Sequence, residues 1–371
     1  MSQEIINPLR SKEYGLKIAT EVGKESEIVA KQLGRPVRIM NFCGTHEWAI
    51  THYGIRSLMP SSIELIPGPG CPVCITPGYY VDLLIDLSFN KYTILTYGDA
   101  FKLPGTSGKK PRSLFQAASM GGSVKVVYSF TDAVKIAAEK PDEKFVFFAV
   151  GFETTIPATA LPMFYGKIPD NLYVLVAYRY TPPVMKYLLN NHPEVEIDGI
   201  IAPGHVSAII GSESWRFLPV EYRIPIVVSG FEPIDVLTSI LLIVKMLKEG
   251  KPDLVNEYSR VVKPEGNTYV KEVMNRVHED VDSYWRGIGV IPESGAKLRE
   301  PYKRLDILYH LGIEEKIVED KLPGCICDKV VLGLAKPVDC PLFMKGCKPQ
   351  LPYGPCMVSS EGACRIWAEN M

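Results

Sequence analysis

Two cysteines separated by two residues are the first candidates for chemistry in this sequence. The stretch Gly68-Pro69-Gly70-Cys71-Pro72-Val73-Cys74 is a C-x-x-C motif enclosed by glycine and proline. It follows an apolar run at 63–66 that is typical of a strand, and it precedes a segment at 79–87 with apolar residues at helical spacing. Backbone N–H groups and the dipole at a helix start stabilise a thiolate, so we expect lowered thiol pKa values here. The pattern predicts a working dithiol or a metal-holding pair.

A third cysteine, Cys43, comes directly after another apolar run and is followed by Thr45, His46 and Glu47. One interpretation is a reactive thiol beside acid–base groups, although a catalytic histidine rarely lies so close along the chain to its nucleophile. A buried structural cysteine is the alternative. The C-x-x-C pair also follows a predicted strand, and this equivalent placement favours a chemical role for Cys43.

A second group of cysteines lies near the carboxyl end of the chain. Its members are Cys325, Cys327, Cys340, Cys347, Cys356 and Cys364. They are separated by one, twelve, six, eight and seven residues, so the paired C-x-x-C knuckles of zinc ribbons are absent. Thiolates converging from proline-rich loops favour an iron–sulfur cluster, with zinc and free or disulfide-bonded cysteines as alternatives. Four ligands suffice for either metal site, so six candidates leave the ligand set open.

Composition limits the class of protein. The chain has 371 residues, 46% of them hydrophobic and 22% charged, which suits a globular protein of two or three domains. The net charge of −1 gives no electrostatic footprint for nucleic acid or for an anionic membrane. The longest apolar run, 236–247, is too short to span a bilayer, and the first residues contain no apolar signal region. We expect a cytoplasmic protein. Disulfides that stabilise a fold are rare in the cytoplasm.

Alternation of β-rich runs with helical stretches predicts an α/β fold with parallel sheets. The expected strands form two series: Val37–Phe42, Ile63–Ile66, Tyr92–Tyr97 and Val124–Tyr128, then Phe145–Val150, Leu172–Tyr178, Gly199–Ala202 and Ile224–Val228. The two series resemble each other at an offset of about 108 residues, which indicates a duplicated half-domain. That any two α/β segments look roughly alike is the alternative explanation. Helices are expected over 17–33, 234–247, 252–261 and 267–277, with an irregular segment at 284–301.

The unusual motifs all follow predicted strands, where ligands of parallel sheets gather. Asp99 and His205 hold matching places in the two series, although each alone is as compatible with an ordinary loop residue. We predict two similar parallel-sheet half-domains facing a cleft, at 36–138 and 139–235. A helical, loop-rich iron–sulfur domain is expected from 1–35 and 236–371. No G-x-G-x-x-G or G-x-x-x-x-G-K motif opens a helix, so nucleotide binding is not indicated.

Taken together, several motifs resemble those of the HypD family of [NiFe]-hydrogenase maturation factors. They are Cys43-Gly44-Thr45-His46-Glu47, Gly68 to Cys74, Gly151-Phe152-Glu153-Thr154-Thr155, Pro203-Gly204-His205-Val206-Ser207 and Cys356-Met357-Val358-Ser359-Ser360-Glu361-Gly362. They occur in the family's order over essentially the whole chain. The resemblance implies a scaffold on which an Fe(CN)2CO unit is assembled before insertion into the hydrogenase large subunit.

The resemblance also implies roles for single residues. Cys43 would hold the iron, Cys71 and Cys74 would be a redox-active dithiol, and His205 and Asp99 would line the same cleft. A [4Fe–4S] cluster would feed electrons to the dithiol, as in ferredoxin–thioredoxin reductase. The favoured cluster ligands are Cys327, Cys340, Cys347 and Cys364, with Cys325 and Cys356 as alternates.

The partners that the resemblance implies are a small HypC-type chaperone, which shares the iron, and HypE, which donates cyanide together with HypF. A monomer that exchanges with its chaperone is expected. Two hypotheses of other classes stay open. One is an iron–sulfur thiol–disulfide oxidoreductase that needs only Cys71 and Cys74, and the other is a zinc-stabilised binding protein without chemistry of its own.

Overall fold

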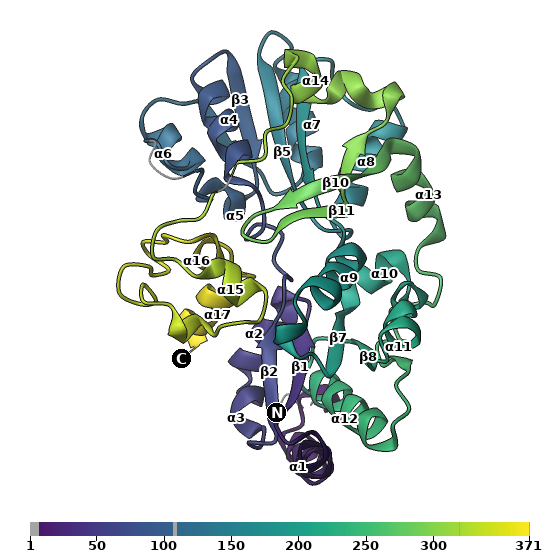
Figure 1. The fold of residues 1–371 in the computed structure, drawn as a ribbon. Coiled ribbons are helices and arrows are strands. Elements are labelled where there is room, and N and C mark those ends of the chain that lie inside the picture. The colour runs from purple at the N-terminus through teal and green to yellow at the C-terminus, as the bar shows by residue number, and fades with distance from the viewer. Residues whose placement is uncertain (1–6, 107–109, 319, 371) are drawn as a thin grey trace, which may run out of the picture.

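The computed structural model describes residues 7–106, 110–318 and 320–370. Two parallel sheets form its centre, and Figure 1 shows them one above the other with the cysteine-rich lobe, in yellow, at their side. Sheet A has the order β2 (Ile63–Pro67), β1 (Val37–Asn41), β7 (Gly199–Pro203), β8 (Ile226–Ser229) and β9 (Leu254–Asn256). Sheet B has the order β4 (Val124–Val126), β3 (Tyr92–Thr96), β5 (Lys144–Gly151) and β6 (Leu172–Tyr178). The predicted α/β class is therefore confirmed.

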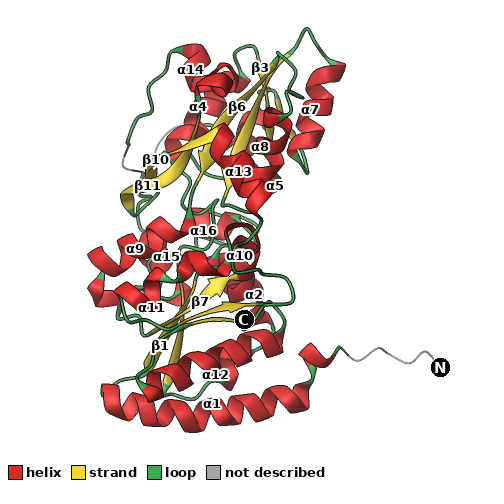
Figure 2. Ribbon diagram, turned by 90° about the vertical axis from the view of Figure 1, so that its right-hand side faces the viewer, coloured by secondary structure: helices red, strands yellow, loops and turns green. Residues whose placement is uncertain are grey.

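Helices connect the strands and cover the sheets (Figure 2). The α-helices are α1 (Lys12–Leu33), α2 (Gly44–His52), α3 (Ile55–Leu58), α4 (Gly78–Ser88), α5 (Gly98–Phe101), α6 (Leu114–Ser119), α7 (Phe130–Glu139), α8 (Ile156–Phe164), α9 (Thr181–Asn191), α10 (Gly204–Ile210), α11 (Phe217–Glu221), α12 (Pro233–Glu249), α13 (Thr268–Val277), α14 (Ile307–Leu311), α15 (Cys327–Val331), α16 (Pro355–Val358) and α17 (Ala363–Asn370). Short 3₁₀ helices lie at Pro8–Arg10, Pro193–Val195, Ser212–Trp215, Glu300–Leu305 and Pro337–Asp339.

The grouping of strands differs from the predicted one. The prediction placed β1 to β4 in one half and β5 to β8 in the other, but each sheet takes strands from both predicted domains, 36–138 and 139–235. Sheet A joins β1 and β2 to β7 and β8, and sheet B joins β5 and β6 to β3 and β4. The predicted similarity pairs each strand of one series with a counterpart in the other series. Replacing β2, β1, β7 and β8 of sheet A by their counterparts gives β6, β5, β3 and β4, which is the order of sheet B from its other edge. The internal similarity therefore holds in the topology, while the two halves exchange their last two strands.

The central strands of both sheets are buried on both faces, as expected for parallel sheets covered by helices, whereas the edge strands β4 and β9 are partly exposed. In β5, Phe145 and Phe147 pack into the core on one side of sheet B, and Val146 and Phe148 pack into the core that the two sheets share. The far face of sheet A is covered by α1 and α12, whose apolar residues contact β1, β7 and β8. The N-terminal helix α1 therefore packs on α12, which belongs largely to the predicted partner segment 236–371, and together they cover sheet A.

Two regions beyond β8 differ from the sequence-based expectation. The segment 252–261 was expected to be helical, but it contains β9, which extends sheet A by pairing with β8. The segment expected to be irregular belongs largely to an antiparallel hairpin of β10 (His278–Trp285) and β11 (Gly289–Leu298). Pro292 and Gly295 interrupt the alternating pattern of β11, which is why the strand was not recognised.

Candidate functional site

The C-x-x-C loop connects β2 to α4, and its two cysteines form a disulfide. The sulfurs of Cys71 and Cys74 are 2.08 Å apart and both residues are buried. The helix α4 begins only at Gly78, so neither cysteine lies within its first turn. The first amide of α4 donates to Oδ2 of Asp320 over 2.6 Å, so a carboxylate from a distant part of the chain occupies the helix start.

The loop that carries Cys43 lies directly against the C-x-x-C loop. The Gly44 amide donates to the Gly70 carbonyl over 3.3 Å, and Cys43 and Cys71 line the same small pocket. A β-carbon added to Gly70 would lie 2.5 Å from the Cys43 nitrogen and 2.7 Å from its α-carbon. Gly70 is therefore the position at which the two cysteine loops come closest.

We expect Gly70→Ala to destabilise the protein by about 1–3 kcal/mol, because the added methyl group forces the two loops apart. Thermal unfolding of the purified variants measures this effect. Gly23→Ala in α1 is the matched control, since a β-carbon there meets no atom within 4 Å. Alanine is the better helix former, so the control should be neutral or more stable by up to about 1 kcal/mol. Equal unfolding temperatures for the two variants would contradict the close approach of the loops.

Glu361 lies beside Cys43. It belongs to the motif at 356–362, and no role was predicted for it. Its β-carbon would be only 2.5 Å from a β-carbon added to Gly44, and it lines the pocket shared by Cys43 and Cys71. Burial of the Cys43 thiol, and secondly the negative charge of Glu361, raise the pKa of Cys43 to about 11. Glu361 is exposed as a whole residue, but desolvation at its carboxyl group raises its pKa to about 7, with a further contribution from Asp99. The thiol of Cys43 is therefore protonated at neutral pH.

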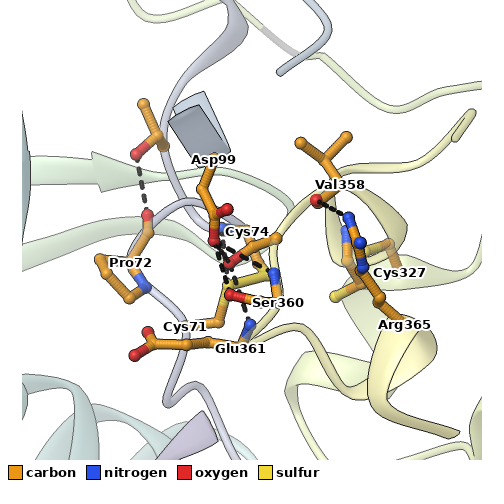
Figure 3. Close-up of a disulfide and its surroundings, with 12 residues drawn as sticks. Cys71, Pro72, Cys74, Asp99, Cys327, Val358, Ser360, Glu361 and Arg365 are labelled. Atoms are coloured by element: carbon orange, nitrogen blue, oxygen red, sulfur yellow. Dashed lines mark hydrogen bonds between the residues drawn. A yellow bond between two sulfur atoms is a disulfide. The ribbon is translucent and has the colours of Figure 1, made fainter. Parts of the chain in front are cut away.

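Asp99 holds the segment that carries Glu361. Its Oδ2 accepts hydrogen bonds from the Ser359 hydroxyl (2.8 Å), the Ser360 hydroxyl (3.0 Å) and the Ser360 amide (3.1 Å). Figure 3 shows this carboxylate next to the disulfide. The structure thus brings Cys43, Cys71, Cys74 and Asp99 together, and Asp99 positions a strap from the C-terminal lobe. A run of polar residues between two cysteines, Ser359-Ser360-Glu361, was the signal in the sequence for this contact.

We expect Glu361→Gln to lower the pKa of Cys43 below about 11, because a nearby negative charge disfavours the thiolate. Iodoacetamide reacts with the thiolate, so alkylation of the Cys43 peptide, followed by mass spectrometry, should become faster in the variant. The difference should appear only above about pH 7, where the wild-type carboxyl group is ionised. Glu369→Gln on the surface of α17 serves as the control. Coincident pH profiles for Glu361→Gln and wild type would place the carboxylate away from the thiol.

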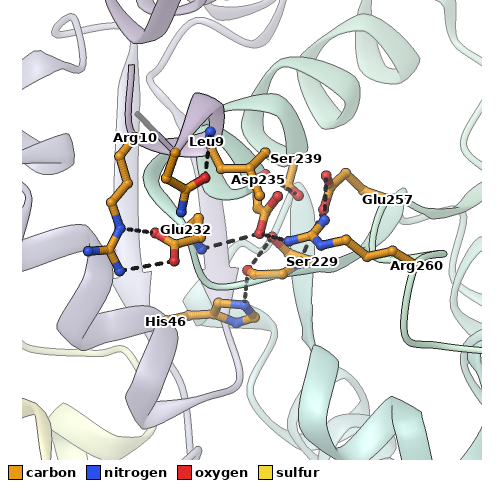
Figure 4. A network of polar contacts seen from close by, with 11 residues as sticks. Leu9, Arg10, His46, Ser229, Glu232, Asp235, Ser239, Glu257 and Arg260 are labelled. Carbon is orange, nitrogen blue, oxygen red and sulfur yellow. Dashed lines mark hydrogen bonds and ion pairs between the residues drawn. The ribbon is translucent and has the colours of Figure 1, made fainter. Parts of the chain in front are cut away.

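The two histidines of the predicted site lie on either side of Phe231. The rings of His205 and His46 stack on Phe231 with centroid distances of 4.0 and 4.5 Å. The Nε2 atom of His46 is 2.8 Å from the Gly230 carbonyl oxygen, and Figure 4 shows it beside the loop that carries Ser229. Burial lowers the pKa of His46 to about 4, so His46 is neutral at physiological pH. His205 is exposed, and this makes it the one of the two that a ligand can reach.

Glu47, predicted as an acid–base group, has its oxygens already engaged. Its Oε1 accepts from Nη2 of Arg56 (2.7 Å) and from the indole nitrogen of Trp367 (2.6 Å), and its Oε2 accepts from Asn41 (2.8 Å). The side chain is 2% exposed. Because Trp367 belongs to α17, this carboxylate fastens the C-terminal helix to α2.

All six C-terminal cysteines line one pocket together with Leu342 and Phe343. Amide groups already point at two of the sulfurs: Cys356 N–H donates to Cys327 over 3.3 Å, and Tyr353 N–H donates to Cys347 over 3.3 Å. The thiols of Cys325 and Cys356 also donate to Cys327, which lowers the pKa of Cys327 well below the usual range of a thiol. Convergent thiols with amide donors fit an iron–sulfur cluster in ligand type. Within the described residues, no three His, Cys, Asp or Glu side chains already have metal-site geometry.

Two small pockets connect the disulfide with these cysteines. Cys71 shares its pocket with Cys43 and Cys356. Cys74 shares a different pocket with Cys325 and Cys327, and Arg286 lines it as well. Arg286 forms an ion pair with Asp320 and donates to the backbone at Pro104 and Gly105, so it fixes the connection between the C-x-x-C loop and the C-terminal lobe. The disulfide therefore lies between Cys43 and the cysteine-lined pocket.

Among the helices of the described residues, none is both long and apolar enough to cross a membrane. A family model named HypD and described as the hydrogenase formation hypA family matches residues 17–371. A putative hydrogenase expression/formation protein of Methanocaldococcus jannaschii is 45% identical, over 95% of this chain and 95% of its own length. Hydrogenase maturation factor HypD2 of Bradyrhizobium diazoefficiens is 40% identical, over 96% and 93% respectively. Hydrogenase maturation factor HypD of Escherichia coli is 38% identical, over 98% and 96%.

Proposed function

The chain belongs to the HypD family of hydrogenase maturation factors, and from this premise we propose that it is the scaffold on which an Fe(CN)2CO unit is assembled. The observation that carries the proposal is that small pockets link three groups of cysteines. These are Cys43, the Cys71–Cys74 disulfide and the six cysteines of the C-terminal pocket. Iron is the cargo, and a soft thiolate suits iron that carries strong-field ligands.

In this proposal Cys43 supplies a thiolate to the iron. Its raised pKa means that iron must displace the thiol proton, so binding releases a proton at neutral pH. In this proposal the proton leaves through the pocket that Cys43 shares with Cys71, whose wall includes Glu361. One thiolate leaves most coordination positions of the iron open. We propose that a HypC-type chaperone provides a second thiolate and that HypE, with HypF, delivers cyanide to the remaining positions. The completed unit is then transferred toward the hydrogenase large subunit.

The C-terminal cysteines would hold a resident [4Fe–4S] cluster, with Cys327, Cys340, Cys347 and Cys364 as the proposed ligands. Such a cluster supplies single electrons at low potential when it is bound. The protein's own part is thiol chemistry: two electrons and two protons convert the Cys71–Cys74 disulfide into two thiols. Cys74 faces the cysteine-lined side and Cys71 faces Cys43, which supports reducing equivalents being delivered to the iron site.

A second candidate function is thiol–disulfide oxidoreduction on another protein, which the formed Cys71–Cys74 disulfide favours. Infrared spectroscopy on the protein purified anaerobically with its small chaperone separates the two. Bands in the cyanide and carbonyl stretching region are expected for the scaffold. Their absence from a preparation whose cluster is intact by electron paramagnetic resonance would overturn the scaffold role in favour of the oxidoreductase.

A further inference from the structure

A cavity of about 510 Å3 lies away from the cysteines and has no part in the function proposed above. Its wall is formed by α4, the end of β6, the β10–β11 hairpin and the segment around α14. It opens beyond the carboxyl end of a strand of a parallel sheet, where such folds bind ligands. Its volume is within the usual range for small-molecule sites.

Arg179, the first residue after β6, lies in this wall as a buried cation without a carboxylate partner. Its side chain is 1% exposed, and its Nη1 and Nη2 atoms each donate over 2.9 Å to backbone carbonyls, those of Tyr178 and Tyr284. Its Nε–H has no hydrogen-bond partner among the described residues. A buried charge that is compensated only by carbonyl dipoles is costly, and an anion in the cavity would offset that cost.

Two more donors of the wall are uncommitted. Ser283 on β10 is buried, its hydroxyl lies over Gly295, and this hydroxyl makes no hydrogen bond to another described residue. Lys297 on β11 forms no ion pair within the described ranges. The Nε–H group of Arg179, the Ser283 hydroxyl and the Lys297 ammonium group thus line one cavity without a hydrogen-bond acceptor among the described residues.

One further cation, Lys303, and three carboxylates, those of Asp306, Glu314 and Glu315, also line the wall. Asp306 accepts from the Leu308 amide over 2.8 Å and so caps α14, while Glu315 accepts from the Tyr80 hydroxyl. Lys303 pairs with Glu300, and Glu314 is exposed. The wall therefore has three cationic and three acidic side chains, and Arg179 is the buried cation among them that pairs with no carboxylate of the described residues.

The remaining wall is apolar, with Val176, Val281, Ala296 and Leu308. We propose that this cavity binds a small organic anion, with its carboxylate or phosphate group at Arg179, Ser283 and Lys297 and its apolar body on these four side chains. Charge-assisted hydrogen bonds hold the acidic group, and apolar contact selects against bare inorganic ions.

Isothermal titration calorimetry of the full chain tests this site with three probes: butyrate, methyl phosphate and the neutral isostere butyramide. At least one anion should bind saturably, and butyramide should bind at least tenfold more weakly. Tighter binding of butyrate identifies the acidic group as a carboxylate, and tighter binding of methyl phosphate identifies it as a phosphate. No saturable binding of either anion at millimolar concentration would overturn the proposal.

Variants locate the site. Lys297→Ala and Ser283→Ala should each weaken anion binding severalfold to tenfold, and Arg179→Gln should abolish it if that variant folds. Lys186→Ala on α9 removes the same charge outside the cavity, so its affinity should equal that of the wild type. The first two substitutions are conservative enough to keep the test independent of the folding of Arg179→Gln. Equal affinities for Lys297→Ala and Lys186→Ala would place the anion elsewhere and refute the site.

Discussion

Replacing Cys43 by alanine should abolish hydrogenase maturation, with activity lowered by at least about a hundredfold in a strain that depends on this protein. The thiol is the one sulfur that lines a pocket with the disulfide yet belongs to neither the disulfide nor the C-terminal group. Without it the iron loses its proposed thiolate ligand, because the neighbouring Cys71 is held in the disulfide and Cys356 lines the C-terminal cysteine pocket. Hydrogenase activity in extracts and the infrared bands of the purified complex should disappear together.

The structural controls for Cys43→Ala come from the same molecule. Cys43 caps no helix through its side chain, so its loss should leave the unfolding temperature and the Cys71–Cys74 disulfide intact. Mass spectrometry of the disulfide and electron paramagnetic resonance of the C-terminal site measure this. Cys71→Ser should instead leave Cys43 able to hold iron while removing the disulfide. A Cys43→Ala protein that still matures hydrogenase would refute the scaffold role. If maturation required Cys71 but not Cys43, the result would support the oxidoreductase.

The eight strands β1 to β8 were predictable because strands buried on both faces appear as continuous apolar runs. Their pairing was not, because the similarity between the two series indicates equivalent elements but does not tell which sheet an element joins. The exchange of β3 and β4 with β7 and β8 depends on pairing between segments far apart along the chain, such as Ile39 of β1 with Gly199 of β7. Likewise β9 is a strand only because the edge of β8 is available to pair with it.

The candidate site was predictable where its residues follow strands in recognisable motifs, as with Cys43, Cys71, Cys74 and Asp99. Contacts between distant segments could not be predicted. Asp320, for example, accepts the hydrogen bond of the first amide of α4 although it lies 242 positions away along the chain. Glu361 likewise reaches Cys43 only because Asp99 holds the Ser359–Ser360 strap.

Glu47→Ala should destabilise the protein by about 3–5 kcal/mol, the range for breaking one side of a buried ion pair. The carboxylate is the common acceptor for Arg56, Trp367 and Asn41, and it is almost fully buried. Its removal leaves the Arg56 guanidinium without its carboxylate and frees the indole N–H that ties α17 to α2. Urea denaturation gives the loss in free energy, and limited proteolysis should release the end of the chain first.

The matched control is Glu64→Ala, which also removes a carboxylate paired with an arginine, Arg38, at 3.2 Å, and with the half-exposed Lys336 at 3.1 Å. Glu64 is about one third exposed, so its loss should cost less than about 1 kcal/mol. The comparison decides between two roles for Glu47. An acid–base residue would lose activity without loss of stability, whereas an anchor loses stability first and activity as a consequence. Because α17 carries Cys364, we expect the Glu47 variant to lose the C-terminal metal site at lower urea concentrations than wild type, while Glu64→Ala keeps it. If Glu47→Ala kept the stability of the wild type, the anchoring role would be wrong. Glu47 would then again be a candidate acid–base residue beside Cys43.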